Sequence, residues 1–255
     1  MANCRCRRAC HLGTLAYSWP MDFAEKLNSI RQKIAAACLR AGREESSVTL
    51  LAVSKGHPAE SIAEAVRCGQ LDFGESKIQE AKIKIPQSPG AARWHMIGHL
   101  QTNKIRDAVH LFGMIQSVDS LRLAEEIQKA ADRSAKTVKI LLEVNVAGES
   151  TKFGYTPDAA VAEIAAINAF PRLEIHGLMA IAPWTPTPER VRPAFRKLRE
   201  VKERCEQVLG APLPTLSMGM SNDFEIAIEE GSTLVRVGTA LFGERSYAKS
   251  RVETE

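Results

Sequence analysis

The segment Val48-Thr-Leu-Leu-Ala-Val-Ser54 decides the fold class of this chain. Its apolar side chains follow one another without polar alternation, which is typical of a strand buried on both faces and therefore of a parallel sheet. The preceding residues 22–41 predict a helix, because apolar side chains recur there at steps of three and four and Gly42 follows as a stop signal. The apolar face of this helix comprises Phe23, Leu27, Ile30, Ile34 and Cys38.

The same alternation of strand and helix repeats along the rest of the chain. Further strands are predicted at 71–75, 93–98, 114–118, 138–145, 173–180, 214–218 and 233–238. Helical patterns lie between them at 59–68, 76–84, 101–111, 120–134, 158–169, 188–208 and 223–230. Strands that alternate with helices imply right-handed crossovers and a parallel sheet, so we expect an α/β protein with a single (β/α)₈ TIM barrel. A doubly wound open sheet is the alternative, but no Gly-rich dinucleotide fingerprint supports it.

The composition agrees with one globular domain. The chain has 255 residues, of which 45% are hydrophobic and 25% are charged, and this balance excludes disordered and fibrous classes. No apolar run approaches the roughly 20 residues that a membrane helix needs, so no membrane partner is predicted. The Pro-dense residues 182–188 are interpreted as a loop between a strand and a helix rather than a linker. We therefore expect one barrel domain over residues 21–255.

The basic excess of the sequence lies mostly outside this domain. The net charge is +4 at pH 7, and three arginines in residues 1–20, which contain no acid, supply most of it. We interpret residues 1–20 as a disordered or non-native extension, with Met21 as the start and Asp22 as a helix N-cap. A transit peptide is the alternative, although the segment is short and poor in serine. The rest of the chain is nearly neutral, so no nucleic-acid partner is predicted.

The cysteines predict a reducing compartment. Cys38, Cys68 and Cys205 lie far apart within helical patterns, as buried small hydrophobic residues do, and a cytoplasmic location follows. The other cysteines lie in Cys4–His11, where the spacing is too short for a usual zinc site.

The helical segment 188–208 is rich in charge and has two interpretations. A basic binding face is one, and a solvated outer helix of the barrel is the other. The second is favoured because the same segment carries an apolar stripe. The stripe comprises Val191, Phe195, Leu198, Cys205 and Val208.

Lys55 is the first candidate for chemistry, because it ends the first predicted strand. Function in a (β/α)₈ barrel lies at the carboxyl ends of the strands. A lysine that is partly desolvated there has a lowered pKa and can form a Schiff base with a carbonyl compound. The simpler interpretation, that Lys55 only reaches solvent, is weakened by the preceding apolar run and by the turn at Gly56-His-Pro58.

Two loops at the end of the chain are suited to an anion. Ser217-Met-Gly-Met220-Ser221-Asn-Asp223 follows the seventh strand, and Gly238-Thr239 follows the eighth. The loops after strands seven and eight are the recurrent phosphate site of this fold, although a plain N-cap is the simpler interpretation of either loop alone. Arg236 is out of register with its apolar neighbours and is predicted to point into the barrel, where it needs a partner such as a ring nitrogen or a carboxylate.

His95 and His99 are four residues apart, and because a strand places positions four apart on one face, a pair of metal ligands is conceivable. No third ligand with suitable spacing is evident, and we predict no metal site. The residues alone thus describe a barrel with a Schiff-base lysine and a phosphate site. A class I aldolase and a pyridoxal 5′-phosphate (PLP) protein both fit this description, and Arg236 suits the pyridine nitrogen of PLP.

Specific motifs are spread in order over the whole predicted barrel. They are Ala52-Val-Ser-Lys55 with Pro58, Phe73-Gly-Glu75 with Gln79-Glu80, Trp94-His-Met-Ile-Gly-His99-Leu-Gln-Thr-Asn103-Lys104, Lys152-Phe-Gly154, His176-Gly-Leu-Met179, Ser217-Met-Gly-Met-Ser221 and Gly231-Ser-Thr-Leu-Val-Arg236-Val-Gly-Thr239-Ala-Leu-Phe-Gly243. In sequence and spacing they resemble the pyridoxal phosphate homeostasis protein family, the single-domain relatives of the alanine racemase barrel. The resemblance runs from about Asp22 to Gly243 and leaves out residues 1–20.

The resemblance implies a fold-type III PLP barrel with Lys55 as the internal aldimine. It further implies cofactor contacts from Ser217, Met220, Ser221, Gly238 and Thr239, with Arg236 near the pyridine nitrogen. An arginine there leaves that nitrogen unprotonated and weakens the ring as an electron sink, which favours carrying PLP over carbanion chemistry. One position departs from the family pattern: Ser76 stands where an asparagine is usual and replaces that cofactor contact only in part.

The function expected from the resemblance is a protein that holds PLP reversibly and takes part in its homeostasis and delivery, without turnover of its own. Apo forms of PLP-dependent enzymes are the expected protein partners, and a monomer is preferred. An amino-acid racemase is the alternative, but racemases of this fold use a second base, usually a tyrosine from a second domain. This chain offers only Tyr17, Tyr155 and Tyr247. An aldolase ranks third.

Overall fold

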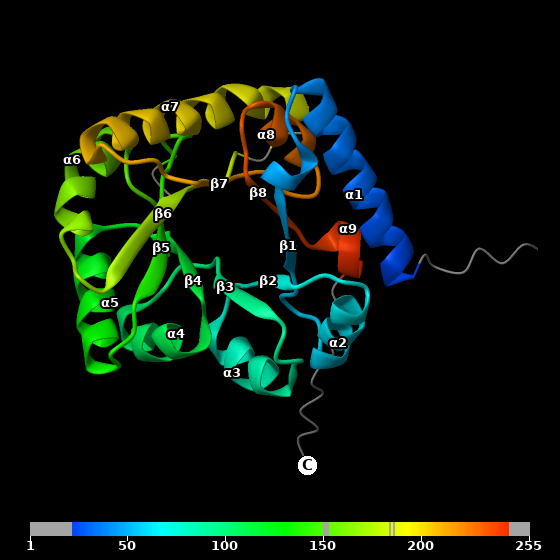
Figure 1. Ribbon diagram of the computed structural model, residues 1–255, viewed down its shortest axis with the longest axis horizontal. Helices are drawn as coiled ribbons and strands as arrows, with labels where there is room; N and C mark the ends of the chain where they lie inside the picture. Colours follow the sequence, from blue (N-terminus) through cyan, green and yellow to red (C-terminus); the bar gives the residue numbers. More distant parts are fainter. Residues whose placement is uncertain (1–21, 150–152, 184, 186, 245–255) are drawn as a thin grey trace, which may run out of the picture.

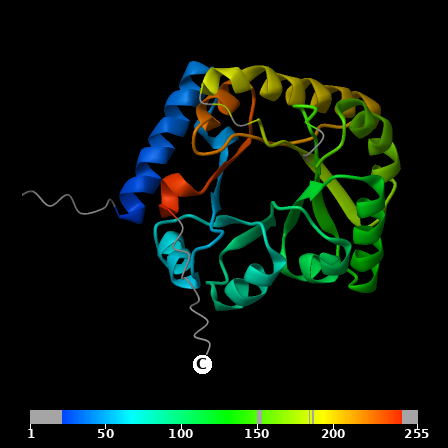
Figure 2. The same ribbon diagram turned by 180° about the vertical axis from the view of Figure 1, so that it is seen from behind.

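Eight parallel strands form a closed barrel within the part of the chain that the computed structural model describes, residues 22–149, 153–183, 185 and 187–244. The strands follow one another around the ring in sequence order, and β8 pairs with β1 to close it. Figure 1 shows the helices surrounding the ring of strands, and Figure 2 shows the same arrangement from behind. The strands are β1 (Thr49–Val53), β2 (Asp72–Glu75), β3 (Arg93–Met96), β4 (Met114–Val118), β5 (Val138–Glu143), β6 (Leu173–Met179), β7 (Thr215–Ser217) and β8 (Leu234–Val237).

The helices lie outside the barrel and alternate with the strands along the chain. They are α1 (Phe23–Arg40), α2 (Ala59–Arg67), α3 (Ile78–Gln87), α4 (Ile105–Leu111), α5 (Leu121–Arg133), α6 (Pro157–Asn168), α7 (Arg192–Leu209), α8 (Phe224–Glu229) and α9 (Thr239–Phe242). Short 3₁₀ turns occur at η1 (Glu45–Ser47), η2 (Thr102–Lys104) and η3 (Pro188–Val191). The predicted (β/α)₈ barrel is confirmed, and each predicted element is present within a few residues of its expected bounds.

The differences from the predicted elements have local causes. α3 runs past its predicted end to Gln87, and the helices predicted at 101–111 and 188–208 each begin with a 3₁₀ turn. α9 was not predicted, because four residues are too few for a helical period. It packs against α1, with the Phe23 and Phe242 rings 5.2 Å apart, so that the two ends of the described chain meet (Figure 1). Asp22 is confirmed as an N-cap, since its carboxylate accepts from the Glu25 N–H at 2.8 Å.

Apolar packing occurs both outside and inside the ring of strands. The larger core lies between strands and helices, while Met114, Leu141 and Met179 form a separate cluster of buried side chains. At Gly177 the main chain passes so close to β7 that an added Cβ would lie 1.7 Å from the carbonyl oxygen of Thr215. Only glycine fits there, where φ is +152°.

The charged segment 188–208 forms an outer helix, as predicted, with Phe195, Leu198 and Cys205 buried. The assignment of Val208 to its buried stripe was wrong, because Val208 lies in the last turn of α7 and is 48% exposed. The prediction that all three helical cysteines are buried was also wrong in part, since Cys68 lies at the C-cap of α2 and is half-buried. All three are free thiols.

The extension predicted for residues 1–20, with Met21 as the start, lies outside the described residues. Among the helices of the described part, none is both long enough and apolar enough to cross a membrane.

Candidate functional site

Lys55 lies two residues beyond the end of β1, at the mouth formed by the carboxyl ends of the strands. The Ser54 N–H donates to the carbonyl oxygen of Gly74 at 3.1 Å, so β1 stays attached to β2 up to the residue before the lysine. The Lys55 side chain is half-buried. This is the end of the barrel at which proteins of this fold bind their ligands.

Arg236 points into the barrel and is only 4% exposed. Its guanidinium donates from Nη1 to the Ser217 hydroxyl at 2.7 Å and from Nη2 to the carbonyl oxygen of Ala180 at 2.9 Å. Burial lowers the pKa of Arg236 to about 10, and the nearby carboxyls of Glu143 and Asp223 oppose this shift. The guanidinium is therefore charged at neutral pH and is held from two sides, by the Ser217 hydroxyl and the Ala180 carbonyl.

The loops after β7 and β8 meet beside β1. The Arg236 N–H donates to the carbonyl oxygen of Gly219 at 3.0 Å, which joins the loop after β7 to strand β8. A Cβ on Gly238 would lie 3.2 Å from the carbonyl oxygen of Val53, two residues before Lys55. Because β8 pairs directly with β1, Lys55 and Gly238 follow neighbouring strand ends. The structure thus brings together Lys55, Ser217, Arg236 and Gly238.

The same loops carry main-chain donors. The N–H groups of Ser221, Gly238 and Thr239 donate to no acceptor within the described part of the chain. The N–H of Met220 is different, because it donates to the Asp223 carboxylate at 2.5 Å, and the Met220 side chain is 38% exposed. Three donors in two adjacent loops can bind an oxyanion without displacing a protein contact.

Two of the predicted site residues lie further out. Ser76 follows β2 and lines a pocket of about 530 Å³ on the rim between β2 and β3, together with Lys77, Gln79 and Lys104. Its main chain packs on Gly98, where an added Cβ would lie 2.3 Å from the Ser76 carbonyl oxygen.

Ser221 lies on the other side of the site. It lines a pocket of about 480 Å³ between α8 and α1, together with Lys33 and Arg40 of α1. Ser76 and Ser221 thus lie on opposite sides of the group around Lys55.

Glu143 is a buried carboxyl at the mouth that the sequence reasoning missed. It ends β5, and its pKa is raised to about 7 by burial and, secondarily, by the Asp119 carboxylate, while Arg236 opposes the shift. The strand-end rule that selected Lys55 would have found it, since Glu143 closes a strand in which every other residue except Lys139 is apolar. A carboxyl with this pKa can hold or release a proton at neutral pH.

A chain of hydrogen bonds inside the barrel was also missed. The Ser217 hydroxyl donates to Gln116 Oε1 at 2.7 Å, and Gln116 Nε2 lies 2.9 Å from His95 Nδ1. Because Arg236 can only donate to Ser217, the order of donors is set from Arg236 through Ser217 and Gln116 to His95. Nδ1 of His95 is therefore the acceptor, and its ring proton lies on Nε2.

The two histidines considered as a metal pair make separate contacts. β3 ends at Met96, so His99 lies beyond the strand and the two histidines do not share one strand face. The His99 ring stacks on Phe153 at 3.7 Å, and its Nδ1 lies 3.2 Å from the Asp119 carboxylate. No cluster of three potential metal ligands occurs among the residues with described positions.

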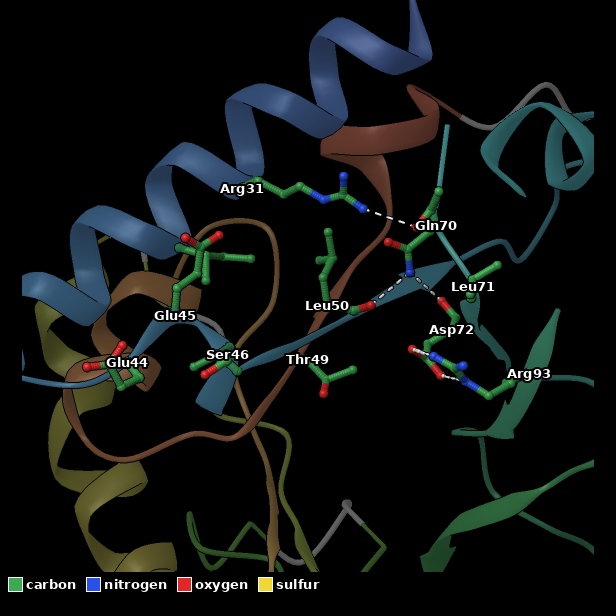
Figure 3. A pocket seen from close by; sticks show the side chains of 13 residues that line it. Arg31, Glu44, Glu45, Ser46, Thr49, Leu50, Gln70, Leu71, Asp72 and Arg93 are labelled. Atoms are coloured by element: carbon green, nitrogen blue, oxygen red, sulfur yellow. Dashed lines mark hydrogen bonds and ion pairs between the residues drawn. The ribbon is translucent and has the colours of Figure 1, made fainter. Parts of the chain in front are cut away.

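A further pocket, of about 580 Å³, lies at the opposite end of the barrel (Figure 3). It is lined by Thr49, Asp72 and Arg93, the first residues of β1, β2 and β3, and by Arg31 of α1. The Asp72 carboxylate accepts two hydrogen bonds from Arg93, at 2.6 and 2.7 Å, and Arg31 is held by the Gly69 carbonyl oxygen. These charges are already paired, and this end of the fold contributes to stability rather than to ligand chemistry.

Comparison with known proteins first defines the class of the barrel. The chain matches the family model described as alanine racemase, N-terminal domain, over residues 26–246. Its barrel also resembles that of alanine racemase from Clostridium difficile, with a TM-score of 0.68 over 89% of this chain and 58% of that one. The identity to that enzyme is 13%, so this likeness concerns the fold alone.

Closer relatives then define the family. A pyridoxal phosphate homeostasis protein of Aquifex aeolicus is 44% identical over 89% of this chain and 100% of its own length, and one of Escherichia coli is 39% identical over 89% and 99%. The structure of PipY from Synechococcus elongatus with PLP bound is 38% identical over 87% of this chain and 100% of that chain, with a TM-score of 0.76. This chain belongs to the pyridoxal phosphate homeostasis protein family.

Proposed function

We propose that this protein binds PLP through a Schiff base on Lys55 and takes part in PLP homeostasis by holding and delivering the cofactor. The observation that carries the proposal is the position of Lys55. This half-buried lysine follows β1, which pairs with β8, and β8 bears the buried Arg236 and is followed by Gly238. The family of the chain and the PLP-bound structure of its relative PipY support the choice of ligand.

The residues at the mouth fit the three reactive parts of PLP. PLP supplies an aldehyde that condenses with an amine, a pyridine ring and a phosphate dianion. Lys55 provides the amine, and water is the only leaving group, so that the link is reversible. The N–H groups of Ser221, Gly238 and Thr239, with two hydroxyls, suit the phosphate, and Arg236 suits the ring nitrogen. Ser217 holds Arg236 in place through the 2.7 Å hydrogen bond.

Two remaining residues of the predicted set have lesser roles. Met220 contributes an exposed side chain to the loop after β7. Its N–H donates to the Asp223 carboxylate, and this bond holds the loop in its conformation. Ser76 lies on the β2–β3 rim and contacts only the edge of the cofactor. This agrees with the shorter serine side chain at a position where the family pattern has asparagine. The domain that binds PLP extends over residues 21–255, and residues 1–20 take no part in binding.

A binding role is favoured over turnover by the chemistry of Arg236. A guanidinium donates a hydrogen bond to the pyridine nitrogen and does not protonate it, so the ring withdraws few electrons from a bound amino acid. A racemase would also need a second base. Burial raises the pKa of Tyr155 above its ordinary value, which makes this tyrosine a poor base at neutral pH.

We further propose that the protein acts in the cytoplasm, as a monomer, and transfers PLP to apo forms of PLP-dependent enzymes. The free cysteines of the described residues, Cys38 in α1, Cys68 at the C-cap of α2 and Cys205 in α7, support a reducing compartment. The position of Lys55 beyond the carboxyl end of β1, where its side chain is only half-buried, supports direct access of an acceptor enzyme to the bound cofactor.

The test is the visible absorption spectrum of the protein mixed with PLP, followed by borohydride reduction and mass spectrometry. Wild type is expected to gain a Schiff-base band and a stable adduct on Lys55, which Lys55→Ala abolishes. Lys77→Ala is the matched control, because Lys77 is an exposed lysine at the same mouth, on the rim that Ser76 lines. A colourless wild-type protein, or an adduct spread equally over surface lysines, would overturn the proposal.

The same preparation distinguishes the other activities. Racemisation of L- or D-amino acids beyond that of the Lys55→Ala control would identify a racemase instead. Binding of a sugar phosphate in the absence of PLP would favour an aldolase. We expect neither result.

A further inference from the structure

A buried ion cluster lies directly behind the turn that carries Lys55. Its members are Glu75, the last residue of β2, and Glu80 and Lys84 of α3, which we call the Lys84 cluster. The Lys84 ammonium contacts Glu75 Oε1 and lies 2.7 Å from Glu80 Oε1. The side chain of Glu75 is fully buried, that of Lys84 is 4% exposed, and that of Glu80 is 26% exposed.

The Lys84 cluster bonds to the main chain on both sides of Lys55. Before the lysine, the Ser54 carbonyl oxygen accepts from Lys84 Nζ at 2.8 Å, and the Ser54 hydroxyl donates to Glu75 Oε1 at 2.6 Å. After the lysine, the Gly56 N–H donates to Glu80 Oε1 at 2.6 Å. All three charged groups therefore contact the residues that flank Lys55.

The turn itself has one defined conformation. The His57 N–H donates to the Ser54 carbonyl oxygen at 3.0 Å, and Gly56 has a φ of +80°, as the third residue of a type II turn requires. Lys55 is the second residue of this turn. The direction in which its side chain leaves the barrel wall depends on the turn remaining in this conformation.

Packing alone does not account for these charges. A lysine and a carboxylate removed from water lose much of their hydration, and apolar residues of similar volume would attach α3 to the barrel as well or better. Charged groups supply something that apolar residues cannot, namely directed hydrogen bonds to the Ser54 carbonyl and to the Gly56 N–H.

We propose that the Lys84 cluster is a positioning device for Lys55. It fixes the turn of residues 54–57 so that the Lys55 amine meets the cofactor aldehyde without first reorganising the main chain. This inference rests on the proposed PLP-binding function. In the step that it assists, the amine nitrogen adds to the aldehyde carbon, a C=N bond forms and the aldehyde oxygen leaves as water, so no oxidant or reductant is needed.

Glu80 is the residue to change, because it is the most exposed member and alone contacts Gly56. Glu80→Ala removes the acceptor of the Gly56 N–H, whereas Glu80→Gln retains an acceptor oxygen at the same reach. Glu80→Asp keeps the counter-charge for Lys84 but withdraws it from Gly56, and it carries the test should Glu80→Ala fail to fold. The matched control is Lys82→Ala. Lys82 lies in α3 like Glu80, but its ammonium pairs with Asp107 of α4 at 3.0 Å and does not contact the turn.

The first measurement uses the protein without PLP. Hydrogen exchange of the Gly56 amide is expected to be about tenfold faster in Glu80→Ala and Glu80→Asp than in wild type, because its hydrogen bond is lost. The rate at which acetic anhydride modifies Lys55, read by mass spectrometry, is expected to change in the same variants. Glu80→Gln and Lys82→Ala should behave as wild type in both measurements.

The second measurement is the rate of Schiff-base formation after rapid mixing with PLP. Glu80→Ala and Glu80→Asp are expected to slow it about tenfold, less than the roughly hundredfold cost of displacing a reactive group by about 1 Å, and Glu80→Gln to restore it. Wild-type rates in folded Glu80→Ala and Glu80→Asp, or an unchanged Gly56 exchange rate, would overturn the inference. Absence of any Lys55 adduct in wild type would instead overturn the proposed function, while Gly56 exchange and Lys55 acetylation still report on the cluster.

Discussion

His95 should make a measurable contribution to the loss of stability of this barrel in acid. The imidazole is enclosed in the barrel, and burial lowers its pKa from the ordinary 6.5 to about 4, with Arg93 and Lys139 adding to the shift and Asp72 opposing it. In the unfolded chain the same imidazole binds a proton near pH 6.5. Between pH 6.5 and pH 4 the unfolded state therefore holds more protons than the folded state, and stability is lost as the pH falls through this window.

The size of the effect follows from the two pKa values. A difference of about 2.5 units corresponds to about 3 kcal/mol when the shift is fully expressed, below pH 4. At pH 5 the contribution is about 2 kcal/mol, and at pH 7 it is close to zero.

The assay compares wild type with His95→Gln by urea unfolding at pH 7 and pH 5. Glutamine keeps an acceptor oxygen for Gln116 Nε2 but takes up no proton in this range. The free energy of unfolding should fall by about 2 kcal/mol more in wild type than in His95→Gln, because every other titrating group, Glu143 included, is common to both proteins. Equal losses in the two proteins, or a His95 pKa near 6.5 by NMR titration, would show that burial of His95 does not cause the loss of stability.

Three further predictions concern the stability of the fold. Gly177→Ala should destabilise the barrel by more than about 3 kcal/mol and reduce the soluble yield, because its Cβ would overlap the Thr215 carbonyl oxygen. On α7, Phe195→Ala should cost about 3–5 kcal/mol in chemical denaturation, whereas Val208→Ala, at an exposed position, should change stability by less than about 0.5 kcal/mol. Asp22→Ala should cost about 1 kcal/mol through loss of the N-cap, and an unchanged thermal midpoint would contradict this.

The architecture of the barrel could be predicted from the sequence because its signals are local. A strand buried on both faces needs a run of apolar residues, as in residues 48–54, and an outer helix needs an apolar stripe, as in α1. The alternation of the two patterns leaves few topologies to choose from. Boundaries were less certain where a 3₁₀ turn begins a helix or where, as in α9, a helix is shorter than one period of the pattern.

Part of the candidate site could be predicted, because function in this fold lies at the carboxyl ends of the strands. That position points to Lys55 and Arg236, and Glu143 occupies the same kind of position at the end of β5. Gln116 and the members of the Lys84 cluster could not be selected, because a polar residue in a strand or helix carries no sign of the partner that it meets. Apart from the Glu80–Lys84 pair within α3, their partners lie 9 to 101 residues away along the chain.

The order of strands and helices, and the strand end at which Lys55 lies, could be read from the sequence because each depends on periodicity within a short segment. The polar contacts required the folded barrel: Arg236 meets Ser217, Gln116 meets His95, and Lys84 meets the turn around Lys55. A hydrogen bond depends on distances of a few tenths of an ångström between atoms of different strands and helices. Such distances are set when the barrel closes and all its elements are packed together.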